Sequence, residues 1–224
     1  MKLYMHPVST ATRPVRLLIK ENGIACDEVV VDILTGAHYQ EPYASLNPNR
    51  LVPMLEDGDF RLTESSAILK YLADVNNLPS YPKDPKKRAK VNEAMDWINT
   101  QLYSALGYGV VYPQLFPHHK RPGDEVQAGT IAWGQEGAKK WLQVLNDHWL
   151  GGGKKYLCGD EITIADYFGA SIVSIGELVG SDFANYPNVK AWLARLKALK
   201  SWKEVNEVFD GFAAANKGKE FARV

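Results

Sequence analysis

The stretch VPMLEDGDFRLTESSAILKYLADV, residues 52–75, decides the fold of the first third of this 224-residue chain. Two short apolar runs, Val52–Leu55 and Phe60–Thr63, flank the pair Asp57-Gly58, which is a strong signal for a tight hairpin turn. From residue 64 onward, apolar residues recur at helical spacing, at Ile68, Leu69, Leu72 and Val75. The stretch therefore predicts a hairpin of two strands that leads straight into a helix.

The residues before this stretch predict a strand, a helix and another strand. Lys2–His6 alternates its side chains, and Thr12–Asn22 has one apolar helical face followed by Gly23, a common helix stop. Asp27–Ile33 contains a β-branched run of strand length. Because hairpin strands are antiparallel, the order strand, helix, strand, strand, strand, helix predicts a small α/β domain with a mixed sheet.

The rest of the chain predicts helices. Three prolines within residues 79–85 block regular structure, so we expect domains at 1–76 and 86–224 joined by a linker at 77–85. Apolar stripes at helical spacing follow: Val91, Met95, Ile98 and Leu102; Trp141, Leu142, Leu145 and Trp149; Ala191, Leu193, Leu196 and Leu199. Thr163 and Asp166 predict a capping box at the start of another helix.

Composition excludes several classes of function. Lys plus Arg and Asp plus Glu number 26 each, so no net field favours nucleic acid or an anionic membrane. No run approaches the roughly 20 apolar residues of a membrane span, and the first residues lack a signal-peptide core, so we expect a cytoplasmic protein. Cys26 and Cys158 are isolated, which argues against a dithiol centre or a cysteine-rich metal site.

The motif HPVSTATR, residues 6–13, lies between the first strand and the first helix. A hydroxyl here could donate a hydrogen bond to an anion, which the helix N-terminus would also attract. A thiol held at this place would be partly ionised at neutral pH. The alternative is that Ser9, Thr10 and Thr12 are only turn and cap residues.

Two further motifs could bind a charged ligand. In NPNRLVPML, residues 47–55, a cis peptide bond before Pro53 would leave the backbone of Val52 free, whereas a trans bond would make Pro53 an ordinary edge-strand residue. The Arg50 guanidinium could pair with a carboxylate. At the start of the predicted helix, Ser65 or Ser66 could simply cap the backbone.

In order and spacing, these segments resemble the cytosolic glutathione transferases of the serine-using theta and delta type, in particular a bacterial-type member. The resemblance covers nearly the whole chain and implies a thioredoxin-like domain followed by an all-helical domain. It implies that Ser9 stabilises the glutathione thiolate, a role that Thr10 could share or replace. It further implies that Val52 binds the cysteinyl backbone, that His38 and Arg50 face the glycyl carboxylate, and that Glu64 and Ser65 hold the γ-glutamyl group.

The expected activity is conjugation of glutathione, as co-substrate, to a small apolar electrophile, with no metal and no nucleotide. The electrophile pocket is expected at Tyr103, Tyr108, Tyr112 and Phe116, although such an aromatic stripe could equally be core. The alternatives are a glutathione-dependent disulfide or peroxide reductase and a non-catalytic glutathione-binding protein. Family members usually form homodimers, and we expect one here.

Overall fold

The structure is a computed structural model that describes all of residues 1–224. Its sheet has four strands in the order β2-β1-β3-β4, with β1 and β2 parallel and the other pairs antiparallel. The strands are β1 Lys2–Met5, β2 Asp27–Val30, β3 Met54–Asp57 and β4 Phe60–Leu62. Asp57 pairs with Phe60 across the turn, where Gly58 has φ 64°. The predicted mixed sheet and hairpin are confirmed.

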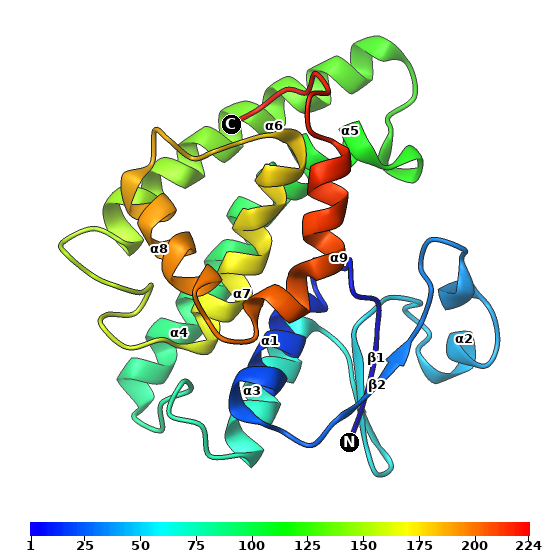
Figure 1. The fold of residues 1–224 in the computed structure, drawn as a ribbon, viewed down its shortest axis with the longest axis vertical. Helices are drawn as coiled ribbons and strands as arrows, with labels where there is room; N and C mark the ends of the chain where they lie inside the picture. Colours follow the sequence, from blue (N-terminus) through cyan, green and yellow to red (C-terminus); the bar gives the residue numbers. More distant parts are fainter.

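Helices cover both faces of this sheet. Helices α1 (Arg13–Asn22) and α3 (Ser65–Val75) lie on the face toward the helical part of the molecule, and the short α2 (Tyr43–Leu46) lies on the other face (Figure 1). Gly23 ends α1 in the left-handed conformation, as predicted. Because α1 is covered on both sides, every residue from Arg13 to Ile19 is buried.

The remaining residues are mostly helical. Besides η1 (Ala37–Tyr39), the helices are α4 Pro85–Trp97, η2 Ile98–Leu102, η3 Ser104–Val111, α5 Tyr112–Leu115, η4 Pro117–His119, α6 Asp124–Val144, η5 Leu145–Trp149, α7 Ile164–Val173, η6 Ser174–Val179, α8 Pro187–Lys197 and α9 Trp202–Ala215. One cluster of 47 buried apolar residues runs from α1 and α3 through these helices. None of the helices has the length and hydropathy needed to cross a membrane.

The predicted stripes are largely confirmed, with one correction. Val91, Met95, Ile98 and Leu102 are all fully buried. In α8, however, the buried face consists of Val189, Trp192, Leu193 and Leu196, while Ala191 is exposed and Leu199 lies beyond the helix end. The sequence pattern placed this face wrongly because it passed over Trp192, the largest fully buried side chain of the molecule.

The predicted capping box at the start of α7 is confirmed. The Thr163 N–H donates to Asp166 Oδ2 at 2.8 Å, and the Asp166 N–H donates to the Thr163 carbonyl at 3.0 Å. The Asp166 carboxylate also accepts hydrogen bonds from the Leu157 N–H and the Trp192 indole, each at 2.9 Å. It therefore joins the start of α7 to the preceding loop and to α8.

Candidate functional site

The sheet register places the first two motifs side by side. Strands β1 and β3 are antiparallel, and Tyr4 pairs with Met54. Val52 precedes Met54 by two residues, so it lies beside the chain that leaves the end of β1. That chain, residues 6–12, carries Ser9 into the start of α1.

The same register brings the third motif to this end of the sheet. Leu55 pairs with Leu62 in the antiparallel β3–β4 hairpin, so Glu64 lies beside Pro53. Strand β2 runs parallel to β1, and the Val31 N–H donates to the Met5 carbonyl at 2.8 Å. The segment with His38 and Arg50 therefore also starts here. Ser9, Val52 and Glu64 therefore lie at one end of the sheet, and the connection that carries His38 and Arg50 begins and ends there.

Ser9 occupies a turn that leads into α1. Its carbonyl accepts the N–H groups of Thr12 and Arg13 at 3.1 Å each, and its Oγ accepts the Thr12 N–H at 3.3 Å. In all these bonds Ser9 is the acceptor, so its hydroxyl proton has no partner in the protein. Thr12 stands at the helix N-cap but its Oγ1 is buried and unpaired, so it does not cap the helix. Ser9 is thus a turn residue whose proton is free for an anion.

Arg13 adds positive charge in the first turn of α1. Its guanidinium is fully buried and donates to Ser174 Oγ at 3.1 Å, Asn206 Oδ1 at 2.7 Å and the Ser171 carbonyl at 2.6 Å. Burial lowers the pKa of Arg13 to about 10, which still leaves it cationic at neutral pH. No carboxylate forms an ion pair with it, so its charge and the α1 N-terminus both favour an anion nearby.

Val52 has the free backbone expected for the cis alternative at Pro53. The Val52–Pro53 bond is cis, and neither the N–H nor the carbonyl of Val52 makes a hydrogen bond within the protein. The preceding residue is fixed instead: the Leu51 carbonyl accepts hydrogen bonds from the Tyr43 hydroxyl and from Asn47 Nδ2. The loop is therefore ordered while one peptide unit remains available to a ligand.

The start of α3 is uncapped, which corrects one interpretation of the sequence. Neither Ser65 nor Ser66 caps the helix with its side chain, and the N-cap is Glu64, with φ 65° and ψ 112°. A positive φ is costly for a non-glycine residue. The exposed Glu64 carboxylate and the unbonded Ser65 hydroxyl stand beside free N–H groups of the first turn. This arrangement can take an ammonium group and a carboxylate together.

His38 and Arg50 lie on the connection between β2 and β3. His38 Nδ1 is buried without a hydrogen-bond partner, and burial together with His118 lowers the pKa of His38. Arg50 is exposed, with φ 54°.

The four predicted pocket aromatics form one cluster. Ring centroids lie 5.3 Å apart for Tyr103 and Tyr108, 5.2 Å for Tyr108 and Tyr112, and 5.6 Å for Tyr112 and Phe116. Tyr112 is 7% exposed and belongs to the core, whereas Tyr108 is 45% exposed. His119 packs 5.2 Å from the Tyr112 ring. The stripe is thus core at Tyr112 and open to a ligand at Tyr108.

Sequence reasoning missed the contact that joins this cluster to the Ser9 loop. The Tyr112 hydroxyl donates to Thr10 Oγ1 at 2.8 Å, and the Tyr103 hydroxyl lies 2.7 Å from that of Tyr112. No sequence signal could have found it, because Thr10 and Tyr112 are 102 residues apart.

No group of three or more His, Cys, Asp or Glu side chains is placed to hold a metal ion. Cys26 and Cys158 are both unpaired and half-buried, and burial raises the pKa of each thiol to about 11. Neither thiol is therefore activated as a nucleophile at neutral pH.

Comparisons with known proteins agree with this geometry. Family models for the N-terminal and C-terminal domains of glutathione S-transferase match residues 1–74 and 134–200. Human glutathione S-transferase theta-1 is 34% identical over 223 residues, which cover 93% of this chain and 88% of the human protein. The bovine theta-1 glutathione S-transferase is 35% identical over 223 residues, which cover 93% of this chain and 88% of the bovine protein.

Solved structures show the same likeness. Human glutathione transferase theta-2, solved in complex with glutathione and an unknown ligand, is similar with a TM-score of 0.82 at 28% identity. The matched residues cover 99% of this chain and 92% of the theta-2 chain. A delta-class glutathione transferase of Nilaparvata lugens is similar with a TM-score of 0.78 at 33% identity. The matched residues cover 96% of this chain and 98% of the delta-class chain.

Proposed function

The chain belongs to the glutathione S-transferase family, and on that premise we propose that it conjugates the glutathione thiolate to small hydrophobic electrophiles. The observation that carries the proposal is the Ser9 hydroxyl, which stands before α1 with its proton unclaimed. A thiol with an ordinary pKa of about 8.5 would ionise more easily here, because its thiolate would accept a hydrogen bond from the Ser9 hydroxyl and would be stabilised further by the helix N-terminus and the Arg13 charge.

The other loops supply the anchors for the tripeptide. The free peptide unit of Val52 would pair with the cysteinyl backbone, and Glu64 with Ser65 would hold the γ-glutamyl ammonium and carboxylate. His38 and Arg50 would face the glycyl carboxylate. These contacts would hold the glutathione sulfur at Ser9. Holding the sulfur beside an electrophile lowers the activation barrier for conjugation.

The electrophile would lie against the exposed side of the aromatic cluster. Tyr108 is the exposed member, Tyr103 and Phe116 are half-buried, and Tyr112 supports them from the core. An apolar aromatic surface next to the sulfur favours a small hydrophobic substrate over a strongly hydrated one.

The direct test is turnover of glutathione with a panel of alkyl and aryl halides. Ser9→Ala should lower kcat at neutral pH by roughly 10²-fold, the size of effect seen when one donor to a developing or bound anion is removed. Ser45→Ala is the matched control, because Ser45 is exposed on α2 and its hydroxyl makes no hydrogen bond in the protein, and it should match the parent. Glutathione retention without turnover of any electrophile would favour the binding-protein alternative, and turnover of disulfides or peroxides alone would favour the reductase.

We also propose that the protein is a cytoplasmic homodimer, on the strength of the family resemblance. Sedimentation at micromolar concentration should then give twice the chain mass of 25.0 kDa, and the chain mass itself would contradict the dimer. Cell fractionation tests the location.

A further inference from the structure

A cleft lies outside the proposed active site, between the start of α4 and the loop that joins η5 to α7. It consists of two adjoining cavities, of about 210 Å³ and about 430 Å³, and Lys90 and Cys158 line both of them. The larger cavity falls in the size range of small-molecule sites. None of the residues proposed for glutathione or for the electrophile lines either cavity.

The smaller cavity combines positive charge with an apolar wall. It is lined by Lys90, His148, Trp149, Lys154, Leu157 and Cys158. No acidic residue is among them. The Trp149 and Leu157 side chains are almost fully buried, so the core of the helical part supplies the apolar wall.

The two ammonium groups of this cavity are available to an anion. Lys154 Nζ donates to the His148 carbonyl at 2.8 Å and makes no ion pair, so its other N–H groups are free. Lys90 forms an exposed ion pair with Glu93 on its own helix. Exposed pairs of this kind contribute little, so a bound anion can replace that partner.

The larger cavity is apolar along one side and of mixed charge at its rim. Val91, Ile162 and two prolines of the linker line it, and so do Lys87, Asp160 and Glu161. The two carboxylates repel a second negative charge at this end of the cleft. The apolar side can instead take an uncharged ring system.

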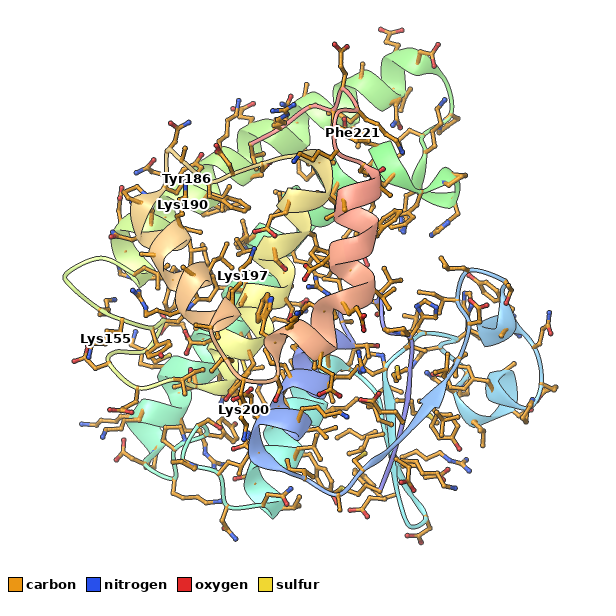
Figure 2. The ribbon with its side chains drawn as sticks, viewed as in Figure 1. Lys155, Tyr186, Lys190, Lys197, Lys200 and Phe221 are labelled. Carbon is orange, nitrogen blue, oxygen red and sulfur yellow. The ribbon has the colours of Figure 1, made fainter.

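The loop that forms one wall of the cleft is held by contacts on several sides. The Leu157 N–H donates to the buried Asp166 carboxylate at 2.9 Å, and the Arg195 Nε–H donates to the Lys155 carbonyl at 3.0 Å. Figure 2 shows Lys155 on this loop, next to α8. A cleft with fixed walls loses little conformational freedom when a ligand binds.

We propose that this cleft binds a small amphipathic monoanion, an aromatic ring system that carries one carboxylate or sulfonate group. The anionic group pairs with Lys90 and Lys154 in the smaller cavity, and the rings lie along the apolar walls from Trp149 toward Val91. The site is separate from the proposed function, because binding here needs neither glutathione nor any residue assigned to conjugation.

The two cysteines provide the test, since Cys158 lines the cleft and Cys26 does not. The probe is 8-anilinonaphthalene-1-sulfonate, whose Kd is measured by its fluorescence, with S-hexylglutathione present to fill the proposed active site. Alkylation of each cysteine by N-ethylmaleimide is followed by peptide mass spectrometry. At about ten times its Kd, the probe should slow alkylation of Cys158 about tenfold by mass action and leave the rate at Cys26 unchanged.

Charge variants test the partners of the anion. Lys90→Met and Lys154→Met should each weaken binding of the probe about three- to tenfold, and Lys154→Arg should stay close to the parent. Lys190→Met is the matched control, because Lys190 is exposed beside Tyr186 near the start of α8 and lines neither cavity (Figure 2). N-phenyl-1-naphthylamine, which lacks the sulfonate, should bind more weakly and should not respond to these variants.

The outcomes separate this inference from the proposed function. Fluorescence of the bound probe without protection of Cys158 would overturn the inference, and so would equal protection by the neutral compound or no binding of the probe at about 1 mM. Lys90→Met and Lys154→Met should conjugate glutathione at the parent rate. Absence of conjugation in the parent would contradict the proposed function and leave the test at Cys158 intact.

Discussion

The Asp166 carboxylate is fully buried and accepts four hydrogen bonds. Oδ1 takes the Leu157 N–H and the Trp192 indole, and Oδ2 takes the Thr163 N–H and hydroxyl, all within 2.8–3.0 Å. Each of these donors is itself buried, so none can turn to water when the carboxylate is removed. This one side chain therefore fixes three segments of the helical part.

We expect Asp166→Ala to lower the free energy of unfolding by about 3 kcal/mol or more, because several buried donors lose their partner at once. The control is Asp160→Ala, at an exposed aspartate of the same loop, which should change the free energy by less than about 0.5 kcal/mol. Urea unfolding measures both. Equal midpoints for Asp166→Ala and the parent would contradict the role of this carboxylate.

His6 predicts a pH dependence of stability. It is 8% exposed, and burial lowers its pKa, an effect that Asp32, 3.6 Å away, only partly opposes. Below about pH 6.5 the unfolded chain binds a proton more readily than the folded one, so the free energy of unfolding falls as pH decreases through that range.

The melting temperature should therefore drop between about pH 7.5 and about pH 5.5, above the range where carboxylates titrate. His6→Asn should show a shallower slope, because its amide oxygen can still accept the Val8 N–H that His6 Nδ1 accepts at 3.3 Å. Burial lowers the pKa of His38 and His119 too, so part of the slope should remain. Identical slopes for His6→Asn and the parent would show that His6 is not the titrating group.

At the scale of elements, the pocket aromatics depend on a close helix crossing. Gly109 of η3 and Gly134 of α6 meet backbone to backbone, and a Cβ built on Gly134 would lie 2.6 Å from the Gly109 Cα. Only glycine fits at such a contact, because the neighbouring atoms belong to the backbone and cannot rotate away. The crossing sets how η3, with Tyr108, sits on α6.

We expect Gly134→Ala to destabilise the protein by about 2 kcal/mol or more, since an inserted methyl group must push the two helices apart. Gly129→Ala is the matched control in the same helix: a Cβ there meets nothing within 4 Å, and alanine favours the helix by about 0.5–1 kcal/mol. Thermal melts should therefore move in opposite directions. A melting temperature for Gly134→Ala equal to the parent would contradict the tight crossing.

The elements also show what a sequence pattern could and could not predict. The hairpin, α1 and α3 follow from local signals such as Asp57-Gly58 and Gly23, so they were predictable. Pro113, by contrast, does not stop the helical chain, which continues to Leu115, because Pro113 falls in the first turn of α5 after the wide turns of η3. Helix packing decides such turns, and packing is not written in local spacing.

At the scale of the whole molecule, the candidate site combines residues from local motifs with contacts between residues that lie far apart in the sequence. Ser9, Val52 and Glu64 could be proposed as site residues because each lies in a local motif that carries the family resemblance, and the sheet register brings these motifs to one end. The partners of Arg13 lie 158–193 residues away, and Thr10 meets Tyr112 over 102 residues. These contacts exist only because the helical part packs against α1, so the sequence alone could not predict them.

The account predicts that the end of the sheet where α1 begins holds glutathione as its thiolate, with Ser9 as the donor. The most direct test is the ultraviolet titration of bound glutathione in the parent and in Ser9→Ala, with Ser45→Ala as control. The parent and the control should show a thiol pKa at least about one unit below the free value near 8.5, and Ser9→Ala should return it toward that value. An unshifted pKa in the parent, or a lowered pKa that Ser9→Ala leaves in place, would contradict the account.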